Sequence, residues 1–251
     1  MTRAGWLAGL LLSILVVVPA PSRAVGLVAD LSNHMIGITT AFVGSNVLLY
    51  GALDEPGSDV AMIVEGPLET RRVARKARLA GIWLQRDAIA FRDVPGYYAV
   101  AASRPLAEIA KPDVLLRHGL LVERLSWPPV GARDRPRAEI DAFRAALIRG
   151  MQRARLYTTT PGEIRFLGTR LFSTTVSFPA NTPPGSYRVQ VLNLRDGRVE
   201  GAQTSVLTVS KIGIEAELYD IAHQRSALYA IASIGLALGA GWIASVAFKR
   251  T

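Results

Sequence analysis

The densest group of side chains that could bind a charged ligand lies in residues 71–78. This segment reads RRVARKAR and carries five positive charges in eight positions. In an extended strand the side chains alternate between two faces, so Arg72, Lys76 and Arg78 share the face opposite Val73. Guanidinium and ammonium groups bind phosphate and carboxylate oxygens. The candidates for contact with an anion or a lipid headgroup are Arg72, Arg75, Lys76 and Arg78.

The same charges are also typical of an outer strand face in water, or of an edge strand that charge protects from aggregation. The formal net charge of the chain is +9 at pH 7. Such a charge favours attraction to anionic lipid headgroups or to an acidic partner.

Catalytic and metal-binding patterns do not occur in the sequence. His34, His118 and His223 lie far apart, and none has a second histidine or a carboxylate at metal-motif spacing. There is no cysteine, no Gly-x-Ser-x-Gly elbow, no P-loop and no dinucleotide fingerprint. We therefore predict a protein without metal, cofactor or enzymatic activity. A hydrolase site built from distant residues stays an alternative, because such sites are defined by geometry rather than by sequence order.

An apolar segment near the C-terminus predicts a transmembrane helix over residues 227–248. It contains no charged residue and no proline. At 1.5 Å per residue it is long enough to cross a hydrocarbon core of roughly 30 Å. Lys249 and Arg250 follow it. Their charge predicts that residues 249–251 form a short cytoplasmic tail.

Small residues recur along this segment and predict close packing against another membrane helix. Gly235 and Gly239 form a Gly-xxx-Gly pair, and other small residues are also spaced four apart. The partner is either an integral membrane transporter or a second copy, although glycine is also common in spans for other reasons. The candidate packing residues are Ser233, Gly235, Ala237, Gly239 and Gly241.

The N-terminus predicts a signal peptide over residues 1–24. A basic start is followed by a short apolar core and a small-x-small ending. Cleavage after Ala24 fits this pattern, and cleavage after Ala20 is the alternative. Export followed by one membrane span places residues 25–226 outside the cytoplasm, as in a single-pass type I membrane protein. That compartment argues against a nucleic-acid partner and leaves the lipid bilayer itself as one partner.

Two regions predict β-structure. Residues 25–104 contain short strand-like segments separated by turn signals, and residues 161–210 repeat the pattern with a hairpin turn at Asp196-Gly197. We expect a mainly β fold of immunoglobulin-like antiparallel β-sandwich units, and the sequence leaves open whether there is one sandwich or two. The predicted strands are 47–53, 59–65, 82–84, 88–91, 97–101, 171–178, 187–191 and 199–209.

Between them, residues 105–160 predict a helical connecting region. A helix is expected to begin at Asp134, with Pro136 in its first turn. Its apolar residues recur every three or four positions. They are Ile140, Phe143, Leu147, Met151 and Ala154. Shorter helices are predicted at 105–110 and 113–118, and residues 211–226 predict an amphipathic juxtamembrane helix.

Several motifs occur together in one order along the chain. They are DLS at 30–32, ITT at 38–40, LLYGA at 48–52, GP at 66–67, GIW at 81–83, VPGYY at 94–98, FPANTPPGSY at 178–187 and RDG at 195–197. With them the chain resembles the alphaproteobacterial putative transmembrane protein family, a family of unknown function. The resemblance implies a periplasmic domain with one C-terminal helix in the bacterial inner membrane. It also implies a neighbouring permease of the sulfite- or organosulfur-exporter type, and it supplies no catalytic residues.

The function expected from these observations is that of a non-enzymatic, membrane-anchored periplasmic protein. We expect it to be an accessory or interaction partner of an integral membrane transporter. The alternative is a periplasmic binding module for an anion or solute, which would use the basic strand or a cleft between the two β-rich regions.

Overall fold

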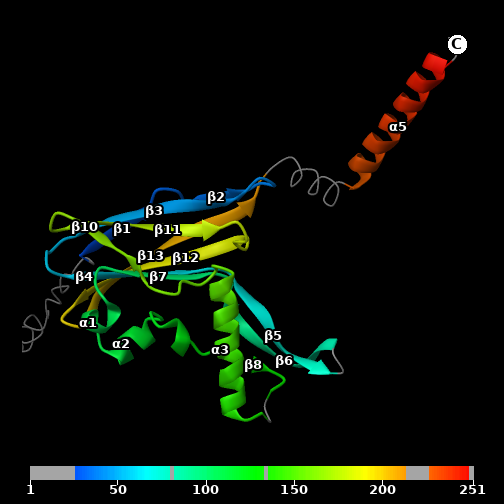
Figure 1. The fold of residues 1–251 in the computed structure, drawn as a ribbon. Coiled ribbons are helices and arrows are strands. Elements are labelled where there is room, and N and C mark those ends of the chain that lie inside the picture. Colours follow the sequence, from blue (N-terminus) through cyan, green and yellow to red (C-terminus); the bar gives the residue numbers. More distant parts are fainter. Residues whose placement is uncertain (1–25, 80–81, 133–134, 213–225, 249–251) are drawn as a thin grey trace, which may run out of the picture.

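The computed structural model of this chain describes residues 26–79, 82–132, 135–212 and 226–248 (Figure 1). The expectation of a mainly β fold is confirmed, because most elements are strands in three sheets. The predicted signal peptide, almost all of the predicted juxtamembrane helix and the predicted cytoplasmic tail lie outside the described residues.

Sheet 1 has four antiparallel strands in the order β1-β3-β11-β10. Its strands are β1 (Leu27–Leu31), β3 (Gly44–Leu53), β11 (Leu171–Pro179) and β10 (Arg165–Leu167). In β11 the predicted alternation is confirmed, because Phe172, Val176 and Phe178 are buried in the core.

Sheet 2 has six strands in the order β2-β13-β12-β4-β7-β9. They are β2 (Met35–Ile38), β13 (Arg198–Lys211), β12 (Gly185–Arg195), β4 (Asp59–Glu65), β7 (Tyr98–Ala102) and β9 (Gly162–Glu163). The two edge pairings, β2 with β13 and β7 with β9, are parallel, which differs from the expected purely antiparallel arrangement. Parallel neighbours need a long connection, and the helical region supplies it between β7 and β9.

The two β-rich regions build the same sheets rather than separate ones. β3 pairs with β11 in sheet 1, and β4 pairs with β12 in sheet 2. Figure 1 shows the two sheets as stacked layers. Phe178 of sheet 1 meets Tyr187 of sheet 2 edge-on at 5.7 Å between ring centroids, and it stacks on Tyr97 at 4.9 Å. One continuous apolar core therefore fills the space between the layers.

Sheet 3 is a long hairpin that projects from the two layers (Figure 1). It consists of β5 (Leu68–Leu79), β6 (Ile82–Pro95) and the short β8 (Pro129–Val130). The predicted strands 82–84 and 88–91 are parts of the single strand β6. Its pairing with β5 continues through two register shifts, so no turn separates the two apolar segments.

The helical region contains α1 (Leu106–Ile109), α2 (Pro112–Arg117), the 3-10 turn η1 (Val122–Arg124) and α3 (Arg137–Arg153). Pro136 is the N-cap of α3 rather than a residue of its first turn, and Asp134 lies outside the described residues. The buried residues of α3 are Phe143, Leu147, Ile148 and Met151. The guanidinium of Arg135 anchors the start of α3, because it donates two hydrogen bonds of 2.6 and 2.7 Å to Asp87 on β6.

The last element is α5 (Ser226–Phe248), a helix of 23 residues that Figure 1 draws apart from the sheets. It contains no acidic residue in its first turn and no basic residue in its last. Among the described residues of the chain, no helix was found that is both long enough and apolar enough to cross a membrane.

Candidate functional site

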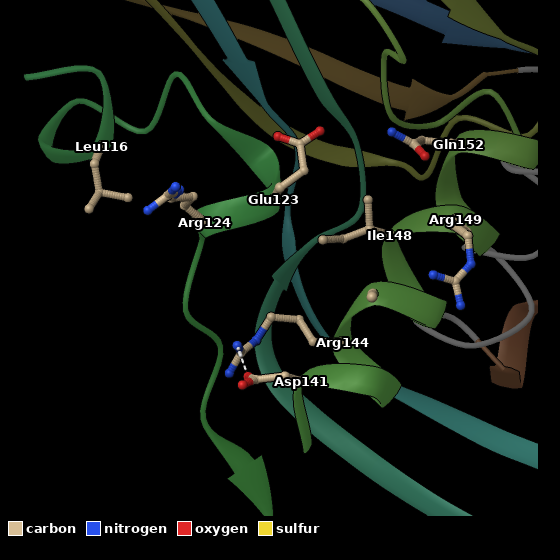
Figure 2. A pocket seen from close by; sticks show the side chains of 9 residues that line it. Leu116, Glu123, Arg124, Asp141, Arg144, Ile148, Arg149 and Gln152 are labelled. Atoms are coloured by element: carbon tan, nitrogen blue, oxygen red, sulfur yellow. Dashed lines mark hydrogen bonds and ion pairs between the residues drawn. The ribbon is translucent and has the colours of Figure 1, made fainter. Parts of the chain in front are cut away.

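A depression lined by three arginines lies along the polar side of α3. The apolar side of α3 packs inward, and Asp141, Arg144 and Arg149 line this depression together with residues of α2 and η1. The depression has a volume of about 500 Å³. It is lined by Leu116, Glu123, Arg124, Asp141, Arg144, Ala145, Ile148, Arg149 and Gln152. Figure 2 shows η1 and α2 on one side of this α3 pocket and α3 on the other.

Three guanidinium groups and two carboxylates contribute to the α3 pocket. Arg144 donates a hydrogen bond of 2.6 Å from Nη1 to Oδ1 of Asp141, and its buried Nε has no hydrogen-bond partner among the described residues. Arg124 and Arg149 form no ion pair within the described part of the chain. Two arginines are therefore free to bind an oxyanion, with Glu123 nearby as the opposing charge.

The three arginines do not converge on one point. Figure 2 shows the side chain of Arg124 beside Leu116, while Arg149 extends away from Arg144. Arg149 also lines a second, smaller depression of about 230 Å³ on the other side of α3. The residues of the α3 pocket carry no hydroxyl, thiol or imidazole group. Its arginines are suited to charge-assisted binding of an anion.

The basic strand identified in the sequence reaches this region through Arg75. The guanidinium carbon of Arg75 lies 4.9 Å from the centre of the Phe143 ring, a cation–π contact that packs β5 against α3. Arg75 and Arg149 line the smaller depression together. Arg72 is exposed and lies on the opposite face of β5 from Arg75. The side chains of Lys76 and Arg78 lie outside the described residues.

Sequence reasoning did not identify the α3 pocket. Arg144 and Arg149 belong to the polar side of the predicted helix, where arginines are ordinary, and Arg124 lies on a turn with no motif around it. The signal that the sequence contained was that two arginines lie on the polar side of one amphipathic helix and a third precedes that helix in the chain. Their proximity depends on how η1 folds back onto α3, which is a tertiary contact.

Another charged depression, of about 490 Å³, lies where β4 and β12 meet α1, and Asp59 and Arg104 form an ion pair in it. Asp59 accepts hydrogen bonds from Nε of Arg104 at 2.9 Å and from the hydroxyl of Ser103 at 3.0 Å. The hydrogen bond from Arg104 lowers the pKa of Asp59 below its usual range. Arg104 also contacts Glu108 of α1 at 3.7 Å, so this cluster joins α1 to the sheet.

The histidines and carboxylates form no metal site in the described residues. No group of three such side chains lies close enough to hold an ion within the described ranges. His34 contacts Asp30 at 2.9 Å, His118 is the C-cap of α2, and His223 lies outside the described residues.

The small residues proposed for helix packing lie on α5. Apart from the chain neighbours and the backbone of α5 itself, no atom of the described chain lies within 4 Å of the Cβ position of Gly235, Gly239 or Gly241. Ala237 is exposed, and the side chain of Ser233 is not among those described. At about 100° per residue, Gly235 and Gly239 share one face of the helix, and Ser233, Ala237 and Gly241 form a second face nearly opposite. Packing through either face stays a prediction.

Comparison with known proteins agrees with the resemblance drawn from the motifs. Residues 26–250 match the model of a family described as a putative transmembrane protein. No curated protein matches the chain.

Proposed function

Because this chain belongs to the putative transmembrane protein family, we propose that it is a non-enzymatic protein anchored in the bacterial inner membrane by α5. The apolar sequence of residues 227–248 carries this proposal. A helix of the length of α5 rises roughly 34 Å, which matches the thickness of a hydrocarbon core. With a cleaved signal peptide at 1–24, the sheets lie in the periplasm and the protein is a single-pass type I membrane protein.

Within this proposal the two-layered β-structure is an immunoglobulin-like domain that presents surfaces to a partner. We further propose that the partner is an integral membrane transporter, of the sulfite- or organosulfur-exporter type, and that the protein acts as its accessory. Support comes from the small residues of α5, which allow the backbone of another membrane helix to approach closely. In the described chain these glycines have no packing neighbour outside their own helix.

The two small-residue faces of α5 permit a matched test. The full-length chain is purified from native membranes in mild detergent as three forms: unchanged, Gly235→Leu with Gly239→Leu, and Ala237→Leu with Gly241→Leu. Each pair adds large side chains to a different face. We expect one pair to lose the co-purified transporter and the other to retain it. Unchanged recovery with both pairs would contradict packing through α5.

A second candidate function, periplasmic anion binding, is favoured by one observation. Arg124 and Arg149 border the α3 pocket without an ion pair in the described chain. If the pocket binds oxyanions, sulfate or phosphate should raise the melting temperature of the unchanged protein, and Arg124→Ala with Arg149→Ala should abolish this shift. Arg198→Ala, which removes an exposed arginine at the start of β13, is the control for loss of charge. No shift with the unchanged protein would reject this candidate.

A further inference from the structure

The outer face of sheet 1 exposes an apolar surface to solvent. Residues of β1, β3, β10 and β11 alternate between the core and this face. The exposed fractions are 63% for Val28, 61% for Leu167, 54% for Leu171 and 48% for Tyr50. Large apolar side chains that cluster on one sheet face are typical of a contact surface.

The strand register arranges these residues in two rows that cross the whole sheet. The first row is apolar on every strand and reads Val28, Ala52, Leu171, Leu167 from β1 to β10. The second row has opposite charges at its two ends and reads Asp30, Tyr50, Ser173, Arg165. A depression of about 350 Å³ lies along the first row.

We propose that this face binds the same face of a second copy of the chain, around a two-fold axis parallel to the strands and lying between β3 and β11. Rotation about that axis reverses the order of the strands. Val28 then faces the partner's Leu167, and Ala52 faces the partner's Leu171. The apolar row therefore meets an apolar row along its whole length, as in two aligned sheets packed about 10 Å apart.

The charges at the ends of the second row match under the same rotation. Asp30 lies on β1 at one edge of sheet 1, and Arg165 lies on β10 at the other edge. The axis brings Asp30 opposite the partner's Arg165, and it does so twice in a symmetric dimer. Within the chain Asp30 contacts His34 and Arg165 contacts Glu163, but each of these side chains is more than half exposed and free to take a further partner.

The direction of the axis also suits two copies in one membrane, a step that rests on the proposed anchor. A dimer anchored in a single bilayer must direct both C-termini to the same side. The strands of the two layers run along a common direction, and β13, the last strand before α5, ends at Lys211 at one end of them (Figure 1). An axis parallel to the strands keeps the C-terminal ends of β13 in both copies at the same end of the dimer. An axis across the strands would place them at opposite ends, so the charge pattern and the anchor select the same geometry.

The test uses single cysteines in the full-length chain, which has no natural cysteine. Thr175 lies on the outer face of β11, next to the proposed axis, and Thr204 is exposed on β13 of the other sheet. A bis-maleimide with a span of about 10 Å, the distance between packed sheets, is applied to native membranes. We expect Thr175→Cys to give a covalent dimer and Thr204→Cys to give none. Equal yields from the two variants would overturn the proposal.

Charge reversal in the Thr175→Cys background tests the pairing itself. Asp30→Arg and Arg165→Asp should each reduce the cross-linked dimer several-fold, because each places like charges across the interface. The double reversal should restore it, and a double variant no better than the single ones would also overturn the proposal. Membrane fractionation of the same samples tests the proposed anchor separately. If the protein stays in the membrane but does not cross-link, the dimer alone is rejected. If the protein is lost from the membrane, the anchor is rejected.

Discussion

The side-chain amide of Gln203 forms two hydrogen bonds with the main chain of Ala29. Its Oε1 accepts from the Ala29 amide at 2.8 Å, and its Nε2 donates to the Ala29 carbonyl at 2.7 Å. Gln203 belongs to β13 of sheet 2, and Ala29 lies in the middle of β1 at the edge of sheet 1. The amide thus occupies two of the main-chain groups that an added strand would use, and it joins the two layers at that edge.

We expect Gln203→Ala to lower the free energy of unfolding by about 1–3 kcal/mol, because the change leaves the amide and carbonyl of Ala29 unpaired near the core. Urea unfolding of the full-length chain in detergent, followed by circular dichroism, measures this loss. Gln190→Ala is the matched control, since Gln190 is a half-buried strand glutamine without a side-chain hydrogen bond in the described chain. Equal losses in the two variants would show that the two bonds to Ala29 contribute nothing specific.

A second prediction concerns the stability of the fold at acidic pH. Hydrogen bonds from Arg104 and Arg135 hold the pKa of Asp59 and of Asp87, respectively, below the usual range. A lowered pKa in the folded state means that the unfolded chain binds the proton first. The stabilising effect is therefore complete above about pH 4, the ordinary aspartate range, and is lost as the pH falls through the lower folded values.

The melting temperature of the unchanged protein should therefore fall as the pH drops below about 4. Asp59→Asn and Asp87→Asn should each lower it at neutral pH and make its dependence on acid shallower. Thermal unfolding across this pH range is the measurement. If both variants keep the slope of the unchanged protein, these two carboxylates do not control acid stability.

Alkaline pH should destabilise the fold through its buried tyrosines. Burial raises the pKa of Tyr97, Tyr98, Tyr157 and Tyr187 well above the usual value. Because the unfolded chain releases these protons near pH 10, stability is complete below that pH and declines above it. Ultraviolet difference spectra should show the phenolate signal of these residues appearing together with unfolding. Phenolate formation in the folded protein, before the loss of circular dichroism, would contradict this expectation.

Two glycine-to-alanine substitutions should change the free energy of unfolding in opposite directions. In Gly51→Ala the new Cβ would lie 2.4 Å from the ring of Phe172 and 2.5 Å from the carbonyl of Val28, so we expect a loss of about 1–3 kcal/mol from overpacking. Gly150 lies in α3, and no described atom beyond its chain neighbours and the backbone of α3 is within 4 Å of its Cβ position, so Gly150→Ala should stabilise by about 0.5–1 kcal/mol. Chemical unfolding of both variants tests this pair. A neutral Gly51→Ala would mean that Phe172 moves aside at no cost.

Much of the secondary structure could be predicted from the sequence, because it depends on neighbours along the chain. Alternation in β11 identified Phe172, Val176 and Phe178 as core residues. The Asp196-Gly197 hairpin was predicted from its two residues, and both adopt the positive φ angles that such a turn requires, 50° and 75°. The segment at 227–248 likewise indicates a long helix through its uninterrupted apolar composition, and α5 covers the same residues.

Which elements meet was decided only by the tertiary structure. The local sequence of β3 does not specify that it pairs with β11, more than a hundred residues later, rather than with a nearer strand. That choice depends on burying both strands in one core together with sheet 2. The same contacts bring Arg124 beside α3, place Gln203 on Ala29 and align Val28 in one row with Leu167. Local propensity determines the elements, whereas long-range burial and register determine the surfaces on which function depends.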